Sequence, residues 1–293
     1  MIAVVGAGAV GGLLAAELIA VGRSVTVCSR SPLDRIVVER SEQPLDVAVS
    51  SVSAPASLTE ADWAFVALKG PDLPGASPWL AAAVGPETVV VAVQNGVEHQ
   101  LKVKPHAHGA TVLPALAYTG VERVERGRLR HFAGHRLIVP AGGDGERFAA
   151  LFEGSALRVE LEPDFLTASW RKLLTNIPSN PISALTEGRM AVLDVPSVRA
   201  LTLGLLEEAI EVGRAEGALL EREDAVRTLA FYDALPRDGG TSMLYDRLAG
   251  RRLEHDLLTG AVVRAAERHG IEVPLNRAIL ALLEGLDFTL TER

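Results

Sequence analysis

The feature that most constrains this chain is a glycine-rich turn close to its start. An apolar run typical of a buried strand, Ile2–Val5, precedes the turn, and a helical pattern follows from Ala9. Gly6, Gly8 and Gly11 stand there in GxGxxG spacing. In such a turn the first glycine permits a tight bend, the second lets the backbone approach a pyrophosphate, and the third allows the helix to pack closely on the strand. The turn therefore predicts a dinucleotide-binding βαβ unit.

The start of the predicted helix strengthens this interpretation. The first backbone N–H groups of a helix, here at Ala9 and Val10, have no partner inside the helix and favour an anion. The alternative is a glycine-rich turn that binds nothing. A strand directly before the motif and a helix directly after it favour the dinucleotide.

The end of the second predicted strand bears on which dinucleotide is bound. An NAD site usually carries Asp or Glu there, whereas arginine accommodates the 2′-phosphate of NADP. This chain has Ser29 and Arg30, with Arg35 as a second candidate cation. The alternative is that Arg30 is a solvated surface residue. Because a guanidinium fork suits a phosphate, we expect NADP(H).

The first half of the chain alternates β-rich runs with helical patterns, which is typical of a parallel sheet covered by helices. Strands are predicted at Ile2–Val5, Ser24–Ser29, Trp63–Leu68, Thr88–Val93, Ala110–Ala117 and Arg136–Val139. Helices are predicted at Ala9–Val21, Ala76–Val84 and Arg147–Glu153. These patterns predict an α/β fold whose N-terminal domain, residues 1–164, is a Rossmann-type doubly wound parallel sheet that binds the dinucleotide.

After Pro163 the β-rich runs stop and apolar residues recur at helical spacing, as in Val198–Ala215 and Asp256–His269. Gly270 is placed to cap the second of these helices, and Pro274 to open the next. We therefore expect an all-helical C-terminal domain over residues 165–293 that carries the substrate and catalytic groups.

Composition excludes several classes of protein. The formal net charge is −8, so no bulk basic field gathers nucleic-acid phosphates. The single cysteine, Cys28, cannot form an intrachain disulfide, which fits a cytoplasmic protein. The longest opening run without charge, Met1 to Ala16, is too short to span a membrane and lacks the charged start of a secretory leader. His106 and His108 lack the further ligands of a zinc motif, so no metal is expected.

Two other predicted strands end in polar residues, at Lys69 and at Asn95. Ligands of doubly wound sheets bind beyond the carboxyl ends of the strands. We expect Lys69 to meet cofactor phosphate or ribose, and Asn95 to contact the nicotinamide ribose and the substrate. Simple turn chemistry is the alternative for both.

The helical half opens with a polar row in an apolar segment. Lys172 and Asn176 are four residues apart and share one face of a helix. Asn180 would continue that face, but Pro178 removes a helical hydrogen bond and should kink or interrupt the helix. A lysine flanked by amides suggests a site that orients a substrate; a snorkelling surface lysine is the alternative.

Taken together, these motifs resemble those of the ketopantoate reductases, or 2-dehydropantoate 2-reductases, over nearly the whole chain. The resemblance includes the glycine turn, Lys69, Asn95-Gly96 and the row from Lys172 to Asn180. It extends to a late block with three parts: Thr241–Asp246, Gly250–Gly260 with Glu254, and Gly270–Pro274.

The resemblance implies that Lys172 donates a proton to a ketone oxygen while NADPH delivers hydride to the adjacent carbon. It also implies that Glu254 interacts with the lysine or a substrate hydroxyl, and that Ser242, Asn176 and Asn180 hold the carboxylate and polar groups of the substrate. A solvated carboxylate opening a helix is the alternative for Glu254.

The expected function is therefore NADPH-dependent reduction of a 2-oxo acid in the cleft between two domains. The resemblance implies reduction of 2-dehydropantoate to pantoate, in the pathway to pantothenate and coenzyme A, by a homodimer. The alternatives are a reductase for another, specialised 2-oxo acid and a non-catalytic NADP-binding sensor. Leu253 and Thr259 depart from the family pattern, where threonine and asparagine are common, and such changes bear on substrate identity.

Overall fold

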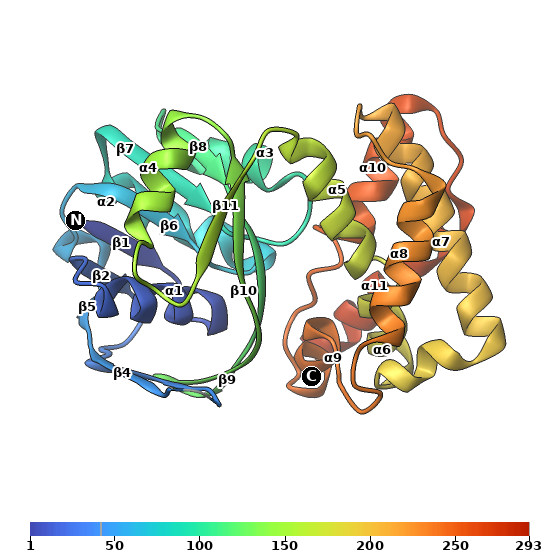
Figure 1. The fold of residues 1–293 in the computed structure, drawn as a ribbon, viewed down its shortest axis with the longest axis horizontal. Helices are drawn as coiled ribbons and strands as arrows, with labels where there is room; N and C mark the ends of the chain where they lie inside the picture. The colour runs from blue at the N-terminus through green and yellow to red at the C-terminus, as the bar shows by residue number, and fades with distance from the viewer. Residues whose placement is uncertain (42, 293) are drawn as a thin grey trace. The chain divides into compact units, whose positions relative to one another are not determined.

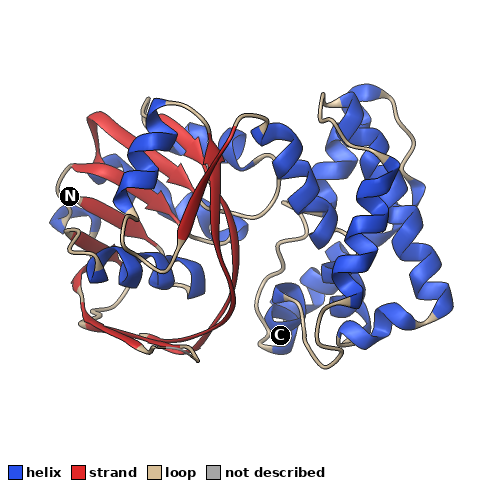
Figure 2. Ribbon diagram, in the orientation of Figure 1, coloured by secondary structure: helices blue, strands red, loops and turns tan. Residues whose placement is uncertain are grey.

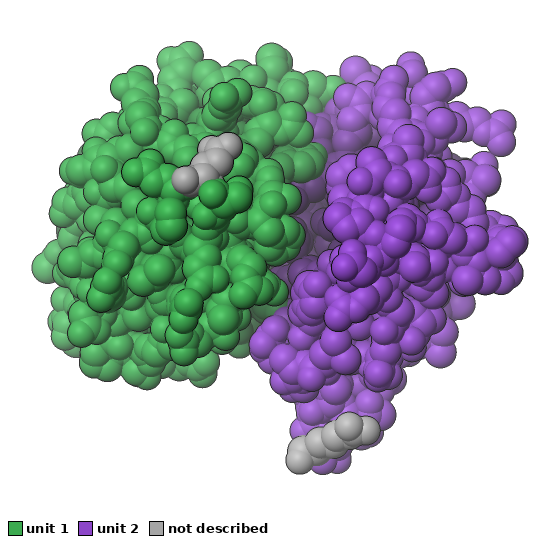
Figure 3. All heavy atoms as spheres, turned by 60° about the horizontal axis from the view of Figure 1, so that its bottom comes forward, with its two compact units in different colours: residues 1–94, 99–165 green, residues 95–98, 166–293 purple. Residues whose placement is uncertain are grey.

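The protein is described by a computed structural model over residues 1–41 and 43–292. The chain divides into two compact units, one formed by residues 1–94 and 99–165 and the other by residues 95–98 and 166–293 (Figure 3). The chain thus enters the second unit at Asn95, returns to the first at His99, and enters the second again at Leu166. Among the described residues, no helix is long and apolar enough to cross a membrane.

A six-stranded sheet of entirely parallel strands forms the centre of the first unit. Its order is β5-β2-β1-β6-β7-β8 (Figure 1). The strands are β1 (Ile2–Val5), β2 (Val25–Cys28), β5 (Ser50–Val52), β6 (Ala61–Val66), β7 (Val84–Ala92) and β8 (Thr111–Pro114). Within this sheet, the third, second, first, fourth, fifth and sixth strands along the chain lie side by side. This is the doubly wound Rossmann order, so the predicted fold class is confirmed.

Both faces of this sheet are buried, and successive side chains along its strands point alternately to one face and the other. Val4 and Phe65 face one apolar core, which they share with helices α1 (Ala9–Ala20) and α4 (Gly143–Leu151). Their neighbours Ala3, Val5, Ala64 and Val66 face the other core, together with helix α2 (Ser77–Ala83). Strands covered on both sides need apolar residues at every position, which is why the sequence shows continuous apolar runs here.

A second sheet in the first unit was not expected. Its order is β11-β10-β3-β4, with β9 paired antiparallel to β10. The strands are β3 (Arg35–Glu39), β4 (Leu45–Ala48), β9 (Leu116–Glu125), β10 (Arg128–Pro140) and β11 (Arg158–Glu162). The single strand predicted at Ala110–Ala117 is therefore wrong, because the chain leaves β8 of the first sheet at Pro114 and joins the second sheet at Leu116.

The remaining short elements of the first unit connect these strands. They are the 3₁₀ helices η1 (Pro55–Ser57), η2 (Gly70–Ala76) and η3 (Lys104–His106), and the helix α3 (His99–Val103).

All the secondary structure of the second unit is helical over its described residues, as predicted (Figure 2). Its elements are α5 (Phe165–Asn176, from Leu166 onward), α6 (Ser179–Thr186), η4 (Met190–Asp194), α7 (Pro196–Ala215), α8 (Arg222–Asp233), α9 (Ser242–Leu248), α10 (Thr259–His269) and α11 (Pro274–Thr291). Gly270 ends α10 in the left-handed conformation, with φ of 65°, and Pro274 is the first residue of α11. Both positions were predicted, and both are confirmed. Trp170, Leu206 and Val262 lie in the single apolar core of this unit.

Candidate active site

The turn between β1 and α1 has space for glycine alone at two positions. Gly6 has φ of 109°, and a Cβ there would lie 3.0 Å from the carbonyl oxygen of Ala67. A Cβ on Gly11 would lie only 2.0 Å from the carbonyl oxygen of Gly6. By contrast, a Cβ on Gly8 would meet no atom within 4 Å. The turn is therefore packed tightly on the protein side and open at Gly8.

The start of α1 carries no group that would oppose an anion. Gly8 is the N-cap and supplies no side-chain cap, and the first turn contains no acidic residue. Ala9 and Val10 are partly exposed, so their N–H groups, which lack partners within the helix, can reach a ligand. The positive end of the helix dipole adds to this preference for negative charge.

The segment after β2 presents a serine and a free cation. The Ser29 hydroxyl donates to the carbonyl of Ser31 at 2.6 Å, which tightens the turn. Arg30 is exposed and makes no ion pair with any described residue. Arg126, from the β9–β10 turn, donates to the carbonyl of Pro32 at 2.7 Å. Sequence reasoning missed Arg126, because its 94-residue separation from Pro32 leaves no local signal.

Arg35, the second cation suggested by the sequence, is committed elsewhere. Its Nε donates to Asp46 at 2.7 Å across the β3–β4 pair, and the same pair forms a salt bridge. The hydrogen bond with Asp46 raises the pKa of Arg35. Both partners are exposed, so the structure favours a surface ion pair over a phosphate contact for Arg35.

Lys69 follows β6 as the residue that caps the 3₁₀ helix η2, and it is partly buried. The strand ends around it are joined by Gln94, whose side-chain amide donates to the carbonyl of Leu68 at 2.8 Å. The ends of β1, β6 and β7 therefore lie at one edge of the sheet, which brings Lys69 to the same edge as the glycine turn.

In the second unit, the predicted break at Pro178 is present. Helix α5 ends at Asn176 and α6 begins at Ser179, with Pro178 as its N-cap. The carbonyl of Thr175 still has hydrogen-bond donors at this break, since it accepts from the hydroxyls of Ser179 at 2.8 Å and Tyr232 at 2.9 Å. The carbonyl of Thr175 therefore keeps hydrogen bonds at the interruption.

The helix restarts so that Asn180 meets Asn176. The Asn180 amide nitrogen donates to Asn176 Oδ1 at 3.2 Å, while its own oxygen accepts from Ser242 Oγ and the Met243 N–H, each at 3.2 Å. Asn180 therefore ties α5 to the start of α9. Asn176 Nδ2 is buried yet has no hydrogen-bond partner among the described residues. The hydrogen bond at Oδ1 orients the Asn176 amide, so its Nδ2 is an oriented donor that is available to a ligand.

Lys172 lies one helical turn before Asn176 on α5 and is partly buried. Asn176, Asn180 and Ser242 thus form one hydrogen-bonded group, built from α5, α6 and α9 of the second unit, and Lys172 lies on the same helix as Asn176.

Glu254 is 9% exposed and lies in the loop before α10. The alternative of a solvated carboxylate that opens a helix is therefore wrong, because α10 begins only at Thr259. The backbone next to Glu254 is anchored: the Leu253 N–H donates to Asp287 Oδ1 at 2.7 Å, and Arg252 bonds the other oxygen of Asp287 at 3.1 Å. A buried carboxylate held in a fixed loop is a group whose charge must be met locally.

Leu253 and Thr259, two of the residues that depart from the family pattern, are both buried in the second unit. Leu253 is 1% exposed and belongs to the apolar core, and Thr259 is fully buried at the start of α10. The Thr259 hydroxyl has no hydrogen-bond partner among the described residues.

Asn95 is partly exposed and belongs to the second unit, although Lys69 and the glycine turn belong to the first. The predicted site residues thus form two groups. The glycine turn, Ser29, Arg30 and Lys69 are in the first unit, and Asn95, Lys172, Asn176, Asn180, Ser242 and Glu254 are in the second.

Family models match both parts of this chain. A family model for ketopantoate reductase PanE/ApbA matches residues 2–143, and the model for its C-terminal part matches residues 164–287. A 2-dehydropantoate 2-reductase of Mycobacterium tuberculosis (strain H37Rv) is 36% identical over 284 residues, covering 96% of each chain.

Solved structures give the same result. A PanE/ApbA family ketopantoate reductase from Ralstonia eutropha JMP134 is 28% identical with a TM-score of 0.91, covering 99% of this chain and 100% of that one. A dimeric ketopantoate reductase from Staphylococcus aureus is 26% identical with a TM-score of 0.88, covering 99% of both chains. The chain belongs to the ketopantoate reductase family, a family of oxidoreductases that depend on a nicotinamide cofactor.

Proposed function

We propose that this protein reduces a 2-oxo acid with NADPH, and that its substrate is 2-dehydropantoate, which becomes pantoate on the route to pantothenate and coenzyme A. The observation that carries the proposal is the group of Lys172, Asn176, Asn180 and Ser242, in which a buried amide donor of Asn176 is left without a partner. An oriented, unused donor beside a lysine suits a substrate that carries a carboxylate next to a ketone.

The glycine turn fits the cofactor. Its open position at Gly8 leaves room for a pyrophosphate against the backbone, and the start of α1 offers N–H groups to it. Ser29 and Arg30 would hold the 2′-phosphate, and Lys69 a phosphate or ribose oxygen. When bound, a reduced nicotinamide supplies the hydride that adds to the ketone carbon.

The groups of the second unit then perform the rest of the reaction. Reduction would place negative charge on the ketone oxygen, and the Lys172 ammonium would donate a proton to that oxygen. Such a donor stabilises the transition state more than the ground state. The product is a 2-hydroxy acid, and water returns the proton to Lys172.

The other side chains orient the substrate. Asn176 donates to an oxygen of the acid, and the Asn180 side chain fixes Asn176 and Ser242 through one hydrogen bond to each. Glu254 accepts from a substrate hydroxyl or from Lys172, and its burial strengthens either contact. Asn95 holds the nicotinamide ribose or the substrate.

The test is the oxidation of NADPH, followed by its absorbance, with 2-dehydropantoate and a panel of branched 2-oxo acids. We expect the highest kcat/KM with 2-dehydropantoate and a clear preference for NADPH over NADH. A higher kcat/KM with another 2-oxo acid would reassign the substrate. Tight NADPH binding without turnover of any member would contradict a reductase and favour a sensor.

The relative from Staphylococcus aureus is dimeric, and we propose that this chain also forms a homodimer. Light scattering on the purified protein decides this: a mass of one chain would contradict it.

A further inference from the structure

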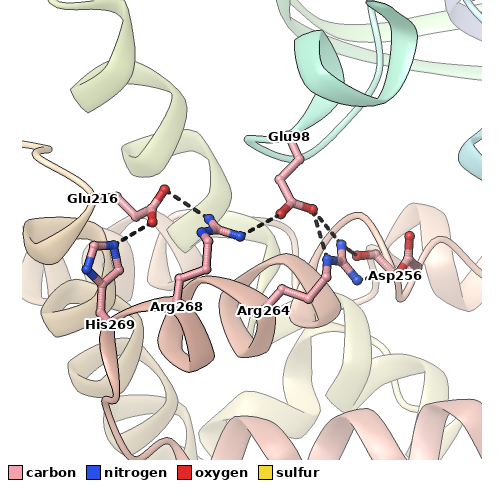
Figure 4. Close-up of polar contacts among 6 residues, drawn as sticks. All are labelled: Glu98, Glu216, Asp256, Arg264, Arg268 and His269. Carbon is pink, nitrogen blue, oxygen red and sulfur yellow. Dashed lines mark hydrogen bonds and ion pairs between the residues drawn. The ribbon is translucent and has the colours of Figure 1, made fainter. Parts of the chain in front are cut away.

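The short segment Asn95–Glu98 is fastened to the second unit by a buried charge. Glu98 is 9% exposed, and each of its carboxylate oxygens meets a different arginine of α10 (Figure 4). Oε2 accepts from Arg264 Nε at 3.1 Å and Nη2 at 2.5 Å, and Oε1 lies 3.4 Å from Arg268 Nη1. A buried carboxylate that has lost its solvation needs such partners. We therefore expect removal of the Glu98 charge to weaken the attachment of residues 95–98 to α10.

Arg264 is also bonded to the loop that carries Glu254. Its Nη2 donates to the carbonyl of Asp256 at 2.8 Å, and its Nη1 forms an ion pair with the Asp256 carboxylate. Burial disfavours the charge of Arg264, but its bonds to Glu98 and Asp256 outweigh that cost and raise its pKa. One guanidinium therefore joins the segment that contains Asn95 to a residue two positions after Glu254.

A second contact fixes the same two segments side by side. Gly96 has φ of 101°, and a Cβ there would lie 2.4 Å from the carbonyl oxygen of Leu257. The backbones of the two segments therefore touch at Gly96, one residue from Asn95. With the contact through Arg264, the segments are joined at two points, which fixes their register as well as their proximity.

At the other end of the network, Glu216 lies outside both segments and is linked to Glu98 through Arg268, which bonds both carboxylates. Arg268 and His269 bind Glu216 at the end of α7, at 3.0 Å and 2.7 Å (Figure 4). This ion pair has the same chemistry as the contact between Glu98 and Arg264, and it lies on the same helix, so it supplies a matched control.

We propose that Glu98 is a positioning residue of the active site: through Arg264 it holds Asn95 in a fixed place relative to Glu254 and the rest of the catalytic group in the second unit. The inference rests on the proposed function. Its consequence is that Asn95 keeps its place relative to the other groups of the second unit, which also carries Lys172.

The test compares Glu98→Gln with Glu216→Gln in the full-length protein. Glutamine keeps the size of glutamate but has no charge, and its NH₂ group would face an arginine N–H donor to which it cannot bond. We expect Glu98→Gln to lower kcat/KM for the 2-oxo acid by about 10- to 100-fold, the range for loss of a charged hydrogen bond. The Kd of NADPH should change less than about threefold, since the phosphate-binding groups lie in the first unit. Glu216→Gln should leave both values near wild type.

A double-mutant cycle with Asn95→Ala separates positioning from a general structural effect. If Glu98 acts through Asn95, Glu98→Gln should cost far less in the Asn95→Ala background, because no amide remains to be misplaced. Full additivity of the two losses would overturn the proposal.

Hydrogen–deuterium exchange tests the contact without any activity. Peptides covering residues 95–98 and 254–258 should exchange faster in Glu98→Gln than in wild type, and at the wild-type rate in Glu216→Gln. If Glu98→Gln does not fold, Arg264→Lys, which can meet only one of the two partners, should show the same local increase. Unchanged exchange would overturn the proposal.

If wild type reduced no 2-oxo acid, the proposed function would fail, and exchange alone would still decide whether Glu98 holds the two segments together.

Discussion

The two units of this protein build their sites in different ways. The glycine turn of the first unit is made of backbone, from contiguous residues between β1 and α1, and its close packing depends on the absence of side chains at Gly6 and Gly11. The group in the second unit is made of side chains from separate segments, with Asn180 and Ser242 joined across 62 residues of sequence.

This difference predicts how each site responds to mutation. A backbone site is damaged by adding atoms, and the damage appears in folding or in cofactor affinity. A side-chain site is damaged by removing atoms, and the damage appears in the rate of the chemical step.

The largest effect is expected for Lys172→Ala. Without its proton donor, the protein should lose about 10²- to 10⁴-fold in kcat, the usual contribution of general acid catalysis. The Kd of NADPH should stay close to wild type, because the groups proposed to hold it lie in the other unit. Steady-state kinetics and a fluorescence titration with NADPH measure both quantities. A near-normal kcat in a folded Lys172→Ala protein would mean that another residue or water donates the proton.

The pair Gly11→Ala and Gly8→Ala separates folding from binding within the glycine turn. A methyl on Gly11 would collide with the carbonyl of Gly6, so we expect a loss of about 1–3 kcal/mol in unfolding free energy. A methyl on Gly8 meets open space and an ordinary φ of −76°, so stability should hold while NADPH binds more weakly. Urea unfolding and NADPH titration report the two effects. Equal stability losses in both variants would refute the packing argument.

Arg30→Asp should change cofactor preference rather than rate. The substitution removes a phosphate partner and adds a like charge, so NADPH affinity should fall by about 10- to 100-fold. NADH affinity should change much less, because NADH has no 2′-phosphate. Arg35→Ala is the matched control, since that side chain is already paired with Asp46, and it should leave the preference unchanged. Equal losses for both cofactors in Arg30→Asp would argue against NADP selectivity at this position.

The smallest effect is expected for Tyr232→Phe. The buried hydroxyl donates to the carbonyl of Thr175 at the end of α5, and its burial raises the pKa of Tyr232. Removing the hydroxyl should cost about 0.5–1.5 kcal/mol of unfolding free energy, because Ser179 still bonds that carbonyl. Chemical denaturation measures the change, and an unchanged midpoint and slope would show that Ser179 alone satisfies the end of the helix.

The parts that sequence could predict are those whose cause is local. The boundaries of β1, the break at Pro178, the cap at Gly270 and the start of α11 at Pro274 all follow from neighbouring residues. They depend on apolar runs and on the special backbones of proline and glycine.

The parts that sequence missed depend on distant partners. The prediction of a strand at Arg136–Val139 covers only the last part of β10; its earlier part exposes Arg128 and Arg130 around the buried Leu129, and this polar alternation is a weaker signal than the apolar runs of the first sheet. Its neighbours β3 and β11 are brought to it only by the fold. In the site, the ion pair of Glu98 and Arg264 spans 166 residues, so no spacing rule could have indicated it.

The most direct test of the central claim follows the hydride itself. Wild-type protein is mixed with NADPH deuterated at the transferable position and with 2-dehydropantoate, and the product is analysed by mass spectrometry and NMR. We expect one deuterium on the carbon that bore the ketone, with the hydroxyl proton coming from exchangeable groups. NADPH that remains unoxidised, or a product without deuterium at that carbon, would contradict it.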